Sequence, residues 1–122
     1  MNNWRIFMFV AAGFNLLIGV GGMLDPAASV DGRMVGLLVA CFGVVYALVA
    51  TDIARYRPML WAGVIGKFGA VALLGPAVAA GAYPQFVGPI LVGDAIFAAA
   101  FLYLLMKPPA WARMNPADGD VL

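Results

Sequence analysis

The sequence has no histidine and a single cysteine, Cys41. One cysteine excludes an internal disulfide and any metal site built from several cysteines, and the lack of histidine removes the commonest metal ligand and proton shuttle. The composition therefore argues against haem and zinc chemistry, and we expect no cofactor. Ser29 is the only serine, and without a histidine base it cannot form a hydrolase triad. No glycine-rich phosphate motif and no catalytic pair of carboxylates is present, so we expect no enzyme activity.

Charge is also scarce. Charged residues make up 11% of the 122 residues, against about 25% in soluble domains. A net charge of +1 provides no basic patch for phosphates, which argues against a nucleic-acid partner. Conversely, 65% of the residues are hydrophobic and the mean hydropathy is +0.98. A chain this short cannot bury so much apolar surface in its own core, so we expect the lipid bilayer to be its main partner.

Four long apolar stretches alternate with short segments that contain proline or charge. Each stretch is close to the ~20 residues that a helix needs to cross ~30 Å of hydrocarbon, and a helix satisfies its own backbone there. The predicted fold class is therefore an all-α integral membrane protein, a four-helix bundle with antiparallel up-down topology in one domain over residues 1–107. We interpret the first stretch as a retained helix and not a secretory signal, because it is long and Asn15 interrupts it. The predicted spans are 5–24, 34–52, 58–80 and 86–106, followed by a short polar tail at 108–122.

The distribution of positive charge predicts the orientation. With four spans, the N-terminus, the second loop and the C-terminus lie on one side, and the opposite loops contain only one basic residue, Arg33. The positive-inside rule then places both termini in the cytoplasm, with the protein in a bacterial inner membrane. The basic residues on the predicted cytoplasmic side are Arg5, Arg55, Arg57, Lys107 and Arg113.

Two charges lie inside the predicted spans, Lys67 in the third and Asp94 in the fourth. At about 1.5 Å per residue both lie roughly 15–18 Å from the cytoplasmic ends, near the bilayer midplane. An ionisable side chain at this depth usually faces the protein interior and has a partner or a task. Asn15 and Tyr46 lie near the same level on the first two spans. The predicted intramembrane polar site is therefore Lys67, Asp94, Asn15 and Tyr46.

The role of this polar site has several interpretations. Lys67 could extend its ammonium toward the cytoplasmic headgroups. It could instead form an ion pair with Asp94 that only fixes the register of the helices, or one that exchanges a proton, binds an ion or contacts a substrate. Asn15 could bridge helices without any further function, at ~0.6 kcal/mol.

A second group of charges is predicted at the cytoplasmic end of the second span, where Asp52, Arg55 and Arg57 form a charge cluster. Asp52 either pairs with the arginines of its own loop or controls access to the level of Lys67. Within the third span, Gly75-Pro76 predicts a kink or the end of the regular helix. Small residues at four-residue spacing on the second span predict close packing, either within one bundle or in a homodimer.

Two classes of function fit these features. In the first, the chain is a transporter or channel for an ion or small solute that uses the Lys67/Asp94 pair. Because four helices enclose little volume, this class predicts a homo-oligomer. In the second, the chain is a non-catalytic accessory or structural subunit of a larger membrane complex, and the pair only holds the helices together.

Overall fold

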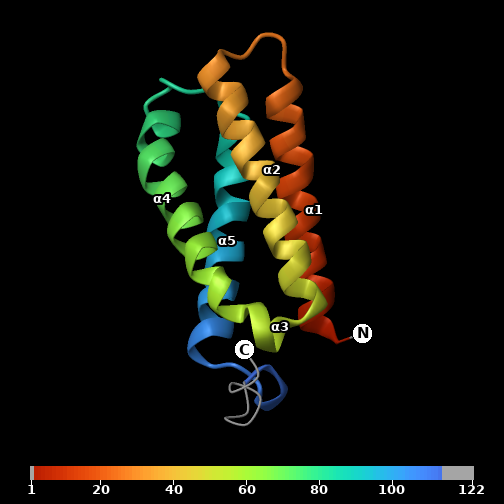
Figure 1. The fold of residues 1–122 in the computed structure, drawn as a ribbon. Coiled ribbons are helices and arrows are strands. Elements are labelled where there is room, and N and C mark those ends of the chain that lie inside the picture. The colour runs from red at the N-terminus through yellow and green to blue at the C-terminus, as the bar shows by residue number, and fades with distance from the viewer. Residues whose placement is uncertain (1, 114–122) are drawn as a thin grey trace. The chain divides into compact units, whose positions relative to one another are not determined.

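The computed structural model describes residues 2–113, which contain helices and no strands. Its helices give it four segments that are long and apolar enough to cross a membrane, as predicted. The long helices are α1 (Asn3–Leu24), α2 (Val30–Thr51), α4 (Leu60–Ala79) and α5 (Val87–Met106) (Figure 1). The short elements are the helix α3 (Ile53–Tyr56) and the 3-10 turns η1 (Arg57–Met59) and η2 (Ala110–Ala112). Residues 114–122 of the predicted tail lie outside the described residues.

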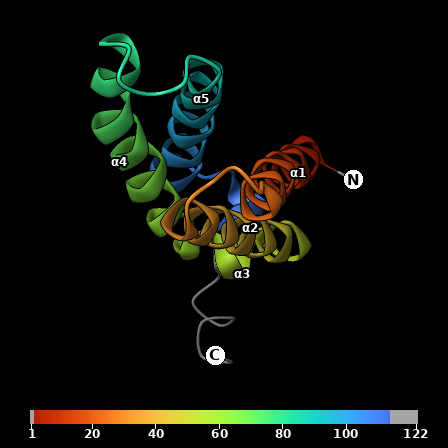
Figure 2. The ribbon, with the colours of Figure 1, turned by 90° about the horizontal axis from the view of Figure 1, so that it is seen from above.

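The chain divides into two compact units, residues 1–56 and residues 57–122. In the first unit α1 and α2 pack along their length, and in the second unit α4 and α5 do so (Figures 1 and 2). We call these the first hairpin and the second hairpin and describe each by itself.

All four long helices begin at residues other than those predicted, by one residue in α5, by two in α1 and α4, and by four in α2. α2 begins at Val30 and not at residue 34, because the Ser29 hydroxyl accepts a hydrogen bond from the Gly32 amide at 3.0 Å and caps the helix there. This first turn is polar and includes Asp31, whose negative charge suits a helix N-terminus. The regular part of α4 begins at Leu60 and not at 58, because Pro58 lies in the preceding 3-10 turn.

The Gly75-Pro76 pair does not end its helix, which continues to Ala79. The end comes at Gly81, whose φ of 76° is the left-handed conformation that glycine adopts readily. The Gly81 amide donates to the carbonyl of Val78 at 3.1 Å, and the Ala82 amide donates to the carbonyl of Ala77 at 2.9 Å. These two bonds form a Schellman motif, which satisfies carbonyls that the end of α4 would otherwise leave open.

The first hairpin is held by direct contact between the backbones of α1 and α2. A Cβ added to Gly43 would lie 3.0 Å from the carbonyl oxygen of Ala12, and one added to Gly19 would meet the backbone nitrogen of Ala40. Gly36 and Ala40 belong to the same buried face of α2. The small-residue face of the second span therefore packs inside its own hairpin, which is one of the two arrangements predicted for it.

The second hairpin buries one side of each helix at spacings of three and four residues. On α4 the buried positions include Leu60, Val64 and Lys67, and on α5 they include Leu91 and Ala98. Lys67 therefore lies within the apolar packing side of its helix. Near the connecting loop the two sides meet in a cluster of Val78, Val87 and Leu91.

Candidate functional site

The two charges of the second hairpin lie on the sides of α4 and α5 that pack together. Lys67 follows the buried Val64 by three residues, and only 5% of it is exposed. Asp94 stands three residues after the buried Leu91 and four residues before the buried Ala98. Because i+3 and i+4 positions share one side of a helix, both charged side chains extend from the packing sides.

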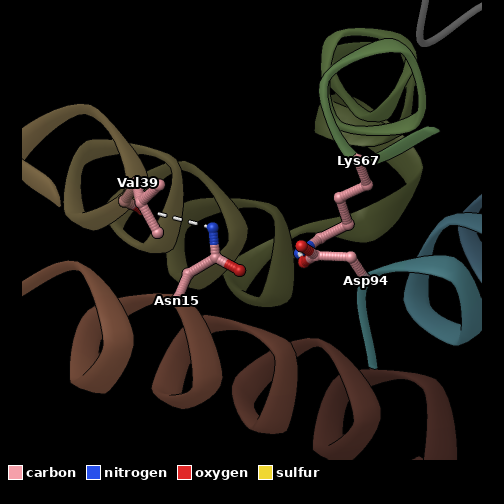
Figure 3. Close-up of polar contacts among 4 residues, drawn as sticks. All are labelled: Asn15, Val39, Lys67 and Asp94. Carbon is pink, nitrogen blue, oxygen red and sulfur yellow. Dashed lines mark hydrogen bonds and ion pairs between the residues drawn. The ribbon is translucent and has the colours of Figure 1, made fainter. Parts of the chain in front are cut away.

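Lys67 and Asp94 form an ion pair, with 2.7 Å between the Nζ and Oδ1 atoms (Figure 3). Their side chains are 6% and 16% exposed. Among residues 2–113 this is the one ion pair that the structure contains. The pairing expected from opposite charges on neighbouring spans is thus present, and the Lys67 ammonium bonds inside the hairpin instead of extending toward a surface.

An aromatic ring supplies a second contact for the Lys67 ammonium. Its Nζ lies 5.5 Å from the ring centroid of Phe97, within the range of a cation–π interaction. Phe97 lies one helical turn after Asp94 on α5, and its ring lies 6.3 Å from that of Phe101. The ammonium is therefore held by a carboxylate and a ring that come from the same helix.

The carboxylate of Asp94 has acceptor capacity that the pair does not use. Its Oδ1 accepts from Lys67, while its Oδ2 accepts no hydrogen bond from any described residue. An ionised carboxylate has two oxygens and room for about four hydrogen bonds. Asp94 is also the more exposed member of the pair. The negative partner is therefore the one that can take a further ligand.

Asn15 and Tyr46 lie in the first hairpin. Asn15 is 5% exposed, and its Nδ2 donates to the carbonyl oxygen of Val39 at 3.2 Å, which links α1 to α2 (Figure 3). Tyr46 is buried, and its ring lies 6.2 Å from that of Phe42. Of the four predicted residues the structure brings Lys67 and Asp94 together, and the grouping of all four in one layer stays a prediction.

The predicted charge cluster of Asp52, Arg55 and Arg57 is not a set of ion pairs. The carboxylate of Asp52 accepts from the backbone amide of Arg55 at 3.2 Å and thereby caps α3. The guanidinium of Arg55 lies 5.5 Å from the ring of Tyr56. Arg57 donates to the carbonyl of Leu105 at 2.9 Å. A local cap satisfies Asp52 because the amide lies within its own turn, so no arginine side chain is needed.

Sequence reasoning missed a set of side chains that bond the carbonyl ends of the long helices. Arg33 donates from Nε to the carbonyl of Met23 on α1 at 2.7 Å. In each of the other three long helices, a side chain of the same hairpin likewise donates a hydrogen bond to a carbonyl of the last turn. These carbonyls lack partners within the helix and carry partial negative charge, so cations and other donors stabilise them. These bonds are Arg5 to Ala50 on α2, Gln85 to Val78 on α4, and Arg57 to Leu104 and Leu105 on α5.

The fold and this site define an all-helical protein with four candidate membrane spans and a buried ion pair between two of them. Among residues 2–113 no group of three or more histidine, cysteine or acidic residues converges to hold a metal. Comparison of the chain with protein-family models, curated proteins and solved structures finds no match. The site is therefore interpreted from its own chemistry.

Proposed function

We propose that the chain crosses a bacterial inner membrane four times as an antiparallel bundle, with both termini in the cytoplasm. The support is the four apolar helices and the charge of their connections. Five basic residues flank one set of helix ends, whereas Arg33 alone flanks the other set. Short basic loops stay on the cytoplasmic side during insertion.

We propose further that the protein is a transporter or channel for an ion or small solute, with the Lys67–Asp94 pair as its working site. The observation that carries this proposal is a buried ion pair with one unbonded carboxylate oxygen. Removing each charge from water costs several kcal/mol, and apolar residues would pack two helices at a lower cost. A pair of this kind in a membrane span is by default a functional feature.

The proposed transport function requires more than one copy of the chain. Four helices of about 20 residues enclose little volume, and the buried residues next to the pair on α4 and α5, Val64, Leu91 and Ala98, are apolar. We therefore propose a homo-oligomer whose copies together provide a path to the pair.

An accessory or structural role in a larger membrane complex is the second candidate. It is favoured by the short Nζ–Oδ1 distance of 2.7 Å, because each charge already lies next to a charge of the opposite sign without any ligand. In this role the pair would fix the register of α4 and α5 and do nothing more. The two candidates differ in what happens when both charges are removed together.

The test is reconstitution of the wild type and of Lys67→Met/Asp94→Asn into liposomes at equal protein density. We would record charge movement on a solid-supported membrane after jumps of H⁺, Na⁺, K⁺, Cl⁻ and small organic ions. We expect a response from the wild type and none from the double variant, although both keep the same size in detergent. An Asp31→Asn variant, which changes an exposed carboxylate outside the pair, should respond like the wild type. If the double variant matches the wild type in every assay, the pair is structural and the transport proposal fails.

A further inference from the structure

We infer that the substrate of the proposed transport site is a monovalent organic ammonium ion, bound by the carboxylate of Asp94. This inference rests on the proposed function and adds the charge and chemical class of the substrate. It follows from three features of the pair. Asp94 is the partner that is open to a ligand, its neighbours on α5 are apolar, and the Lys67 ammonium is already bound to it.

The first feature determines the sign of the charge. An anion would have to reach the Nζ of Lys67, which already donates to Asp94 and lies against the face of Phe97. The face of an aromatic ring carries negative potential and repels anions. A cation needs only the Oδ2 of Asp94, which accepts no bond from the described residues. The geometry therefore favours binding of a cation to Asp94 over binding of an anion to Lys67.

The second feature separates organic from inorganic cations. A metal cation that has lost its water needs several oxygen ligands, typically six or more for Ca²⁺ and Mg²⁺. Within residues 2–113 no cluster of acidic ligands exists. The residues three and four positions from Asp94 on α5 are all apolar, namely Ile90, Leu91, Phe97 and Ala98. An organic ammonium places most of its surface against apolar groups and needs few acceptors, and an aromatic ring stabilises its charge.

The third feature is that an alkylammonium already occupies part of this site. The Lys67 side chain is a primary ammonium on an apolar stem, held at 2.7 Å from Oδ1 and 5.5 Å from the Phe97 ring centroid. The chain thus contains an internal example of the ligand chemistry that we infer. A substrate ammonium would share the carboxylate with Lys67, and repulsion between the two cations would weaken its binding enough to permit release.

The test compares three small aromatic solutes that carry different charges. Phenethylammonium is positive, 2-phenylethanol is neutral and phenylacetate is negative. Their binding to the full chain in lipid nanodiscs would be measured by calorimetry. We expect phenethylammonium to bind at least about tenfold more tightly than the other two, because a charge-assisted hydrogen bond is the stronger kind.

Four variants test whether Asp94 is the binding group. Asp94→Asn should lose at least about tenfold in affinity for phenethylammonium, and Phe97→Leu should lose a few-fold through the missing ring. The control Asp31→Asn should bind like the wild type. Lys67→Met should bind more tightly, because the internal competitor is gone; a purely structural role for Lys67 predicts no such gain.

Several results would overturn the inference and leave the transport proposal intact. These are tighter binding of phenylacetate that depends on Lys67, unchanged phenethylammonium binding in Asp94→Asn, or charge movement with Na⁺ or K⁺ but not with the amine. If the wild type moves none of the solutes and the double variant behaves like the wild type, both the inference and the proposed function fail. Phe97→Leu keeps both charges, so it provides a test even where Asp94→Asn fails to fold.

Discussion

Gly19 of α1 and Gly36 of α2 lie so close together that neither has room for a side chain. A Cβ on Gly19 would lie 2.7 Å from the carbonyl oxygen of Gly36, and a Cβ on Gly36 would lie 2.7 Å from the carbonyl oxygen of Gly19. Because the obstructing atoms belong to the backbone, the helices would have to move apart to admit a methyl group. This contact sets the distance between the two helices of the first hairpin.

We therefore predict that Gly36→Ala lowers the free energy of unfolding by about 1–3 kcal/mol, the usual cost of overpacking. The matched control is Gly13→Ala on α1, where an added Cβ has no atom within 4 Å. Unfolding of both variants in detergent, followed by circular dichroism against temperature, would measure the difference. Equal stability of the two variants would contradict the close contact.

Because Lys67 and Asp94 form an ion pair in the second hairpin, we predict that the stability losses from substituting them are not additive. Lys67→Met or Asp94→Asn alone leaves one buried group without its partner, and we expect each to cost about 3–5 kcal/mol of stability. The double variant should lose much less than the sum of the two single losses, because no unpaired charge remains. Denaturant titration of the four proteins would give the coupling energy. Losses that simply add would mean that the two side chains do not interact.

Arg57 should stabilise the end of α5. It donates to the carbonyls of Leu104 and Leu105, although its buried Nε has no acceptor among the described residues, which offsets part of the gain. We expect Arg57→Met to cost about 1–2 kcal/mol and to raise hydrogen exchange in the last turn of α5. Arg55→Met is the control, because the guanidinium of Arg55 is exposed and only contacts the ring of Tyr56. If both variants exchange alike, the carbonyl contacts of Arg57 contribute nothing.

The proposed orientation can be measured with single cysteines in a Cys41→Ser background. We expect Ala27→Cys and Tyr83→Cys, in the two loops with few basic residues, to react with a membrane-impermeant maleimide added to intact cells. Met59→Cys and Ala110→Cys should react only after the membrane is opened, because they lie beside the basic residues. All four positions are exposed in the structure. The reverse pattern of labelling would place the termini outside.

The pairing of Lys67 with Asp94 could be predicted because each charge has few possible partners inside the membrane spans. Both charges lie in apolar stretches, their helices are joined by a short loop, and an unpaired charge in lipid is costly. The partner of Asp52 could not be predicted in the same way. Its carboxylate could bond either an arginine side chain or a backbone amide, and in the structure it accepts from the amide of Arg55 at 3.2 Å, where the chain turns into α3.

The sequence by itself determined that this chain is helical and has four segments able to cross a membrane. Length and hydropathy are local properties, and in lipid each segment must satisfy its own backbone. Only the tertiary structure decided which glycines touch, which arginines bond the helix ends, and that Asp94 keeps one oxygen unbonded. These features depend on the rotation and register of one helix against its neighbour. Both are set by packing between residues far apart in the chain, and a local sequence pattern does not predict this packing.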